Sequence, residues 1–300
     1  MILKSSFSNM VTLENDYLRV SIRNKGAEIT SVYNKISKLE HVWQADPSVW
    51  PWHAPNLFPV IGGCIDNQIR VDGMPYPMSR HGFARNSEFV LLEGSDRHAE
   101  FSLGYSEETL KAYPFRFQFQ LLYYLDDHRL HVTFKVINED IRDIYFSVGA
   151  HPAFNVPFHP AEKFEEYYLE FEHDEPLDTH LISPEGFFNG EKETVDTEGR
   201  LLPLTRSLFA RDALVLKNIR SRKVWLRSRT RSQHVEVTFP HFDYLGIWSK
   251  PGADFICIEP WMGCADSAGN LTDVSRKEGI RKLEKGHVFE AEYSIGVYQS

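Results

Sequence analysis

The sequence is poor in features that mark several common classes of protein. It has three cysteines, Cys64, Cys257 and Cys264, and no CxxC pair, which argues against a disulfide framework or a structural zinc site. No stretch approaches the roughly 20 apolar residues that span a bilayer, and the N-terminus lacks the apolar run of a signal peptide. We therefore expect a soluble, cytoplasmic protein with reduced thiols, in which Cys257 is a small core residue.

Concentrated positive charge is also missing. The 33 Lys and Arg residues are scattered among 42 Asp and Glu residues, which gives a formal net charge of -9 and no basic stripe that could follow a phosphate backbone. Nucleic acid is therefore not an expected partner. The chain also lacks a Pro/Gly/Ser-rich linker, a low-complexity tract and a fixed-period repeat, so residues 1–300 are interpreted as a single domain.

Helical periodicity is rare, whereas strand periodicity is common. In "FRFQFQ", Phe115, Phe117 and Phe119 share one face, and after a turn at Asp126 and Asp127 the alternation returns in "LHVTFKV", which predicts a hairpin. Similar alternation occurs in "YLRVSIR", "AEFSLGY", "KVWLRSR", "HVEVTF" and "VFEAEYSIGVY". Only "SEETLKAY" and "SRKEGIRKL" suggest short helical turns. The pattern predicts an all-β chain built as a large antiparallel β-sandwich.

Three segments place an ionisable residue beside an apolar strand end: "HGFAR" with His81, "VGAHPAFN" with His151, and "FICIEPWMG" with Glu259. Pro260 is expected to stop the last strand, so that the Glu259 carboxylate projects into a cavity walled by loops. Desolvation there would raise its pKa and make it a better base near neutrality. A structural role is the alternative for each: a core or capping histidine, a turn histidine, and a carboxylate that accepts backbone N–H groups.

Taken together, "HGFAR", "HPAFN" and "CIEPW", in this order on an all-β chain, resemble the aldose 1-epimerase (galactose mutarotase) superfamily. "APNLFPVIGG" and "YLGIWSKPG" resemble its LacX-type branch. The resemblance implies a galactose-mutarotase-like supersandwich that interconverts the α and β anomers of a free sugar without a metal or an organic cofactor. It also implies roles for three residues: Glu259 as general base, His151 as general acid, and His81 as a residue that holds the sugar.

Further binding residues follow from the same resemblance. An aspartate before an apolar strand binds sugar hydroxyls in the family, which maps onto Asp212 in "ARDALVL", where a strand-edge charge is the alternative. Trp248 is expected among the aromatic residues that face the sugar. Many relatives carry an arginine after the "FPVIG"-like stretch, but this chain has Gly62–Cys64 there. Arg85 is the candidate replacement, with a surface or strand-pairing charge as the alternative, and the departure leaves the identity of the sugar open.

The chemistry requires two proton carriers. Opening a pyranose needs a base to take the proton of the anomeric hydroxyl and an acid to protonate the ring oxygen, with the roles reversed on closure. We expect His151 to be protonated, because Glu259 nearby would favour the charged imidazole. The expected partner is a small sugar, a hexose with or without a phosphate group, bound by a monomer or homodimer.

Two other classes of protein remain open at this point. A non-catalytic carbohydrate-binding or sugar-sensing protein would use the same fold and aromatic residues, including Trp248 and Trp261, without proton transfer. A cupin-like metalloenzyme would use His81, His151 and Glu259 as ligands, although the chain lacks an HxH pair. A glycoside hydrolase would need two facing carboxylates, and the motifs supply one.

Overall fold

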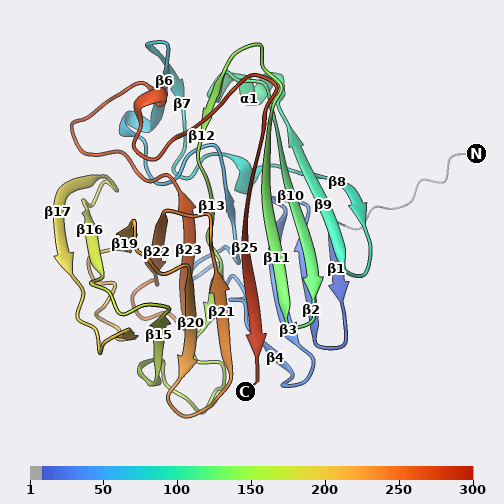
Figure 1. Cartoon of the computed structure of the whole chain (residues 1–300), viewed down its shortest axis with the longest axis vertical. Coiled ribbons are helices and arrows are strands. Elements are labelled where there is room, and N and C mark those ends of the chain that lie inside the picture. Colours follow the sequence, from blue (N-terminus) through green and yellow to red (C-terminus); the bar gives the residue numbers. More distant parts are fainter. Residues whose placement is uncertain (1–8, 300) are drawn as a thin grey trace, which may run out of the picture.

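Two large antiparallel β-sheets form the body of the protein, and the computed structural model describes residues 9–299 (Figure 1). The first sheet has nine strands, in the spatial order β18 (Leu201–Pro203), β15 (Tyr167–Phe171), β20 (Lys223–Ser228), β21 (His234–Thr238), β25 (Val288–Tyr298), β11 (Arg129–Asn138), β10 (Phe117–Asp126), β9 (His98–Gly104) and β8 (Val90–Gly94). The second has eight, with β17 (Phe188–Thr194), β16 (Asp178–Ile182), β19 (Leu214–Lys217), β22 (Tyr244–Trp248), β23 (Phe255–Met262), β13 (Val148–Ala150) and β5 (Asn56–Leu57) in this order and β14 (Ala153–Asn155) also paired with β23.

Smaller elements complete the described chain. One sheet of four strands contains β1 (Met10–Glu14), β2 (Leu18–Arg23), β3 (Glu28–Asn34) and β4 (Leu39–Glu40), and two-stranded sheets pair β6 (Gln68–Val71) with β7 (Met74–Pro77) and β12 (Ile144–Phe146) with β24 (Arg281–Leu283). The described chain also contains the short helix α1 (Glu107–Ala112) and separate 3₁₀ turns at Ile65–Asn67, Ala84–Asn86, Phe164–Glu166 and Val274–Arg276. Within residues 9–299, no helix is long and apolar enough to cross a membrane.

The predicted all-β sandwich is confirmed. The predicted hairpin is β10–β11, paired from Phe117↔Asn138 to Asp126↔Arg129, and every second residue of β11 is buried. The helical turn expected in "SEETLKAY" is α1, which begins at an N-cap Ser106 whose side chain accepts the Thr109 backbone N–H. The second prediction was half wrong: "SRKEGIRKL" forms a 3₁₀ turn only at its start. Beyond the left-handed Gly279 it becomes β24, because β12 offers a strand to pair with.

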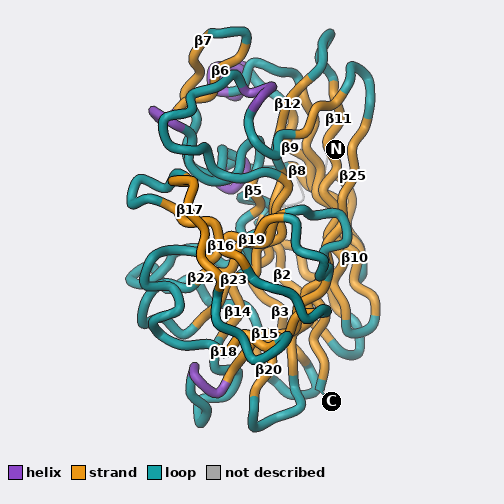
Figure 2. The backbone as a smooth tube through the Cα atoms, turned by 60° about the vertical axis from the view of Figure 1, so that its left-hand side comes forward, coloured by secondary structure: helices purple, strands orange, loops and turns teal. Residues whose placement is uncertain are grey.

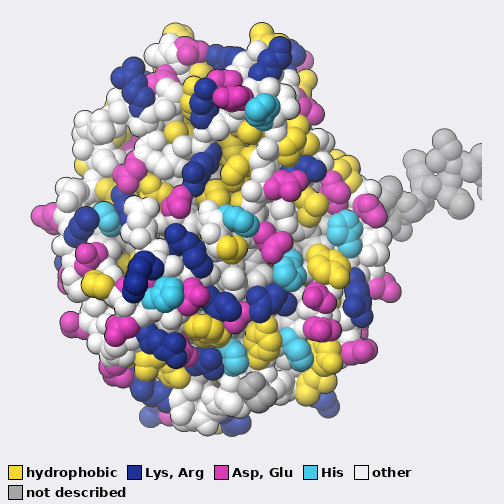
Figure 3. Space-filling model, in the orientation of Figure 1, with side chains coloured by type: hydrophobic (Ala, Val, Ile, Leu, Met, Phe, Trp, Pro, Cys, Tyr) yellow, Lys and Arg dark blue, Asp and Glu magenta, His cyan; other side chains and the backbone are white. Residues whose placement is uncertain are grey.

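Alternation along β23 gives the eight-stranded sheet two different faces. Ile256, Ile258 and Met262 point into the main apolar core, which also contains residues of the nine-stranded sheet. Cys257, Glu259 and Trp261 therefore share the opposite face, away from that core. Figure 2 shows long loops gathered on the side of β16, β17 and β22, where this face lies. On the face seen in Figure 3, Lys and Arg side chains are interspersed with Asp and Glu.

Candidate active site

Glu259 lies in the interior of β23, so the expectation that the strand ends there was wrong. Pro260 is tolerated because of what lies beside it. The N–H of Ile258 donates to the carbonyl of Pro152, 3.2 Å away, so by alternation the ring nitrogen of Pro260 faces the same side. On that side the chain leaves the sheet between β13 and β14, and no strand there needs a hydrogen bond from residue 260.

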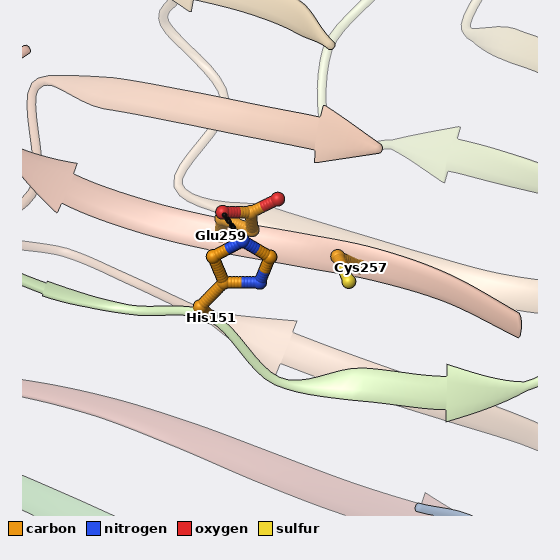
Figure 4. A group of neighbouring side chains, drawn as sticks. All are labelled: His151, Cys257 and Glu259. Atoms are coloured by element: carbon orange, nitrogen blue, oxygen red, sulfur yellow. Dashed lines mark ion pairs between the residues drawn. The ribbon is translucent and has the colours of Figure 1, made fainter. Parts of the chain in front are cut away.

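His151 lies in that break between β13 and β14, as predicted for a strand end. Its backbone N–H donates to the carbonyl of Pro55 at 3.1 Å, and its ring stacks on Trp50 with centroids 5.1 Å apart. The ring turns toward β23, so that His151 Nε2 lies 3.0 Å from Glu259 Oε2 (Figure 4). The two residues are 8% and 1% exposed. Two strands far apart in sequence thus bring an imidazole and a carboxyl group together.

Burial pushes both groups toward their neutral forms. It raises the pKa of Glu259 well above its ordinary value, with a smaller contribution from the negative charge of Asp212. It lowers the pKa of His151 to about 3, with a smaller contribution from the positive charge of Arg85. The raised carboxyl pKa agrees with the prediction, but the expected charged imidazole is contradicted. Loss of water around the ring disfavours the charged imidazole, and the neighbouring Glu259 carboxyl group, itself protonated, offers no negative charge to offset that loss.

His81 is held as a neutral ring with a defined tautomer. The backbone N–H of Gly62 donates to His81 Nδ1 at 3.2 Å, so the ring proton belongs on Nε2, which remains a donor. Burial lowers the pKa of His81 well below its ordinary value, helped by His151, Arg85 and Arg80. The next residue must be glycine: Gly82 has φ +73°, and a Cβ there would lie 2.1 Å from the carbonyl oxygen of Phe58.

All six residues predicted for the site line one pocket of about 440 Å³. They are His81, Arg85, His151, Asp212, Trp248 and Glu259. Trp50, Arg80 and Trp261 are among the other lining residues, and of these three only Trp261 had been considered, as an aromatic residue of a sugar-binding protein. The sequence held a signal for Trp261, because it stands two residues after Glu259 on a strand. Trp50 and Arg80 come from irregular segments, whose folding no alternation reveals.

Trp261 lies flat against the sheet because both neighbouring strands carry glycine. A Cβ on Gly246 of β22 would lie 2.6 Å from the Trp261 ring, and one on Gly149 of β13 would lie 2.7 Å from it. Among residues 9–299, the buried indole N–H finds no hydrogen-bond partner, and neither do His151 Nδ1 and Glu259 Oε2. Although Glu259 Oε2 lies close to His151 Nε2, the two atoms are not aligned for a hydrogen bond. Such atoms are costly to bury and would be satisfied by a polar ligand.

Asp212 and Arg85 differ in how firmly they are held. Asp212 is exposed, has φ +92°, and its Oδ1 accepts the N–H of Ala213 at 2.7 Å. Arg85 is half-buried, with its guanidinium 5.1 Å from the ring centre of Trp52 and its Nη2 donating to the carbonyl of Arg80 at 2.9 Å. Its Nε is buried and has no hydrogen-bond partner in the part of the chain that the structure describes. Arg85 is therefore part of the pocket wall, whereas Asp212 lies at the rim.

A metal is poorly suited to the residues present. The ligand atoms of His151, Cys257 and Glu259 lie within 4.8 Å of one another (Figure 4), a set that differs from the His81, His151 and Glu259 expected for a cupin-like enzyme. Burial raises the pKa of the Cys257 thiol well above its ordinary value, which favours the form that binds metal weakly. No described residue supplies His151 Nδ1 with the acceptor that usually orients a metal-bound histidine.

Comparisons with known proteins find similar sequences and similar folds over almost the whole chain. The family described as Aldose 1-epimerase matches residues 9–295. The chain is 35% identical over 296 residues to the chromosomal protein LacX of Lactococcus lactis subsp. lactis, with 96% of this chain and 99% of that protein covered. A galactose mutarotase related enzyme from Lactobacillus acidophilus has a TM-score of 0.92 at 33% identity, covering 96% of this chain and 97% of that one. A galactose mutarotase-like protein from Lactobacillus casei has a TM-score of 0.91 at 36% identity, covering 96% and 100%.

Proposed function

Because this chain belongs to the aldose 1-epimerase family, we propose that it interconverts the anomers of a free aldose by general acid–base catalysis at Glu259 and His151. Membership supports a sugar-related function. The observation that carries the finer proposal is the 3.0 Å approach of His151 Nε2 to Glu259 Oε2 in the pocket. The anomeric hydroxyl and the ring oxygen of a pyranose are bonded to the same carbon, so the groups that serve them must lie close together.

The reaction requires only that His151 and Glu259 hold one proton between them. Glu259 takes the proton of the anomeric hydroxyl while His151 gives one to the ring oxygen, and the C1–O5 bond breaks to leave an aldehyde. At that stage Glu259 is protonated and His151 is neutral, which is the state that burial of the two groups favours. After rotation about C1–C2, the reverse transfers close the ring on the other face.

Substrate binding must therefore favour the charged pair before ring opening. An anomeric hydroxyl that donates to Glu259 stabilises the carboxylate, and a ring oxygen that accepts from His151 stabilises the imidazolium. The neutral His81, with its proton on Nε2, offers a donor to a further sugar oxygen. Trp50, Trp248 and Trp261 supply apolar faces for the C–H side of the ring.

The experiment is to follow the decay of freshly dissolved α-anomers across a panel of aldoses by polarimetry, with wild-type protein and Glu259→Gln. An amide keeps the size of the side chain but cannot accept the anomeric proton, so we expect kcat to fall about 10²-fold or more while sugar binding persists. A catalytic role for His151 predicts the same pattern for His151→Asn. Near-normal turnover by folded Glu259→Gln protein would contradict the mechanism. Wild-type protein that binds sugars without speeding their equilibration would favour the non-catalytic binding protein.

A further inference from the structure

Two arginines at the pocket have no carboxylate partner. Many arginines of this acidic protein form ion pairs, such as Arg129 with Glu236 and Arg206 with Asp254. Arg80 and Arg85 both line the pocket, and neither pairs with a carboxylate within the part of the chain that the structure describes. Their positive charge is therefore available to a bound molecule.

Local contacts hold both guanidinium groups at the pocket. The Arg85 side chain is fixed by its hydrogen bond to the carbonyl of Arg80 and by the ring of Trp52. The Arg80 guanidinium rests on Gly186, in the loop between β16 and β17: a Cβ on Gly186 would lie 1.5 Å from Arg80 Nη2. Gly186 is buried and has φ +91°, so this loop presents bare backbone where the arginine lies.

The charges around the pocket do not balance. His81, His151 and Glu259 are all driven toward neutral forms by burial. The remaining charged side chains of the lining are Arg80, Arg85 and the rim residue Asp212, so positive charge is in excess in a protein of formal net charge -9. Guanidinium groups present several N–H donors and no acceptor, a pattern that suits an oxyanion better than a hydroxyl, which needs both.

We infer that Arg80 and Arg85 bind an oxyanion carried by the substrate, so that the preferred sugar bears a phosphate or a carboxylate. This inference rests on the proposed function and narrows its substrate class. The anomeric hydroxyl must be free to reach Glu259, so the anionic group belongs on a carbon other than C1. Arg80 and Arg85 then select the sugar, while His151 and Glu259 carry out the proton transfers.

The first test compares the anomerisation of glucose, glucose 6-phosphate and glucuronate by the wild-type protein. We expect the kcat/KM of at least one anionic sugar to exceed that of glucose about tenfold or more, the size of one charge-assisted hydrogen bond. The advantage is expected to shrink at high salt, since Arg80 is exposed. The two anionic sugars distinguish a phosphate subsite from a carboxylate subsite.

The second test uses Arg80→Gln, with Arg97→Gln as the matched control. Both arginines are exposed, but Arg97 does not line the pocket. Arg80→Gln is expected to lower the ratio of anionic to neutral kcat/KM about tenfold, and Arg97→Gln to leave it unchanged.

The outcomes separate this inference from the proposed function. Turnover of glucose with no preference for either anionic sugar, or a ratio that Arg80→Gln does not change, would overturn the anion subsite and leave the mutarotase proposal standing. Wild-type protein that turns over no sugar of the panel would overturn the proposed function and, with it, the inference that rests on it.

Discussion

At the scale of single residues, the site depends on burial more than on attraction between charges. His151 and Glu259 are close enough to form an ion pair, yet loss of water favours a protonated carboxyl beside a neutral imidazole. Such a pair titrates as a unit, and the form with one proton is the catalytic one. A second proton binds only at a pH near 3, where the imidazole titrates, and the shared proton leaves only above the ordinary range of a carboxyl group.

This titration predicts an unusual pH profile. Above the pH near 3 at which it titrates, the His151 imidazole of the folded protein stays neutral, so kcat/KM for a neutral aldose should show no histidine step near the ordinary pKa of 6.5. The measurement is enzymatic anomerisation by polarimetry, corrected for the spontaneous rate at each pH. A step near 6.5 that His151→Asn removes would show that the imidazole titrates normally and that burial does not control the pair.

At the scale of strands, local patterns carried much of the prediction. Alternation located the hairpin β10–β11, and short motifs found six residues that line the pocket. The interior position of Glu259 could not be predicted, because it depends on a break between β13 and β14 on the far side of Pro260. Arg80 was missed for a similar reason: its place is set by the bare backbone of Gly186, about a hundred residues away along the chain.

The glycine beside Trp261 offers a test at this scale. Gly246→Ala puts a methyl group 2.6 Å from the indole and should push the ring off the sheet, raising KM for the sugar and destabilising the fold by about 1–3 kcal/mol. The measurements are KM for a turned-over aldose and the midpoint of urea unfolding. Gly104→Ala in β9 is the control, because its Cβ would meet no atom of residues 9–299 within 4 Å. Equal effects of the two substitutions would show that Trp261 is not held by Gly246.

At the scale of the whole molecule, apolar packing holds the sheets together, and a buried polar contact between two of the sheets adds to it. His41 follows β4 of the four-stranded sheet and is fully buried, while Gln233 precedes β21 of the nine-stranded sheet. Gln233 Nε2 lies 3.4 Å from His41 Nε2 and donates to Ser37 Oγ at 3.2 Å. An unprotonated His41 can accept from this amide, whereas a protonated ring would place two donors face to face.

His41 therefore links the stability of the molecule to pH. Burial lowers its pKa to about 3, with a smaller contribution from His159, whereas in the unfolded chain it titrates at its ordinary value of 6.5. A lowered histidine pKa means that stability is complete above 6.5 and is lost as the pH falls toward 3, because only the unfolded chain takes up the proton. His53 and His151, with pKa values lowered to about 4 and about 3, add losses of the same sign.

We therefore predict that the free energy of unfolding falls as the pH drops from 6.5 to 4, and that His41→Gln reduces this slope by about 1 kcal/mol per pH unit. Urea unfolding at a series of pH values measures the slope, which is separate from any loss of packing that the substitution causes at neutral pH. His173→Gln is the control, because His173 is exposed. If His41→Gln and wild-type protein lose stability in parallel, the His41 imidazole takes up its proton in the folded state. Its burial as a neutral ring then does not limit the acid stability of this protein.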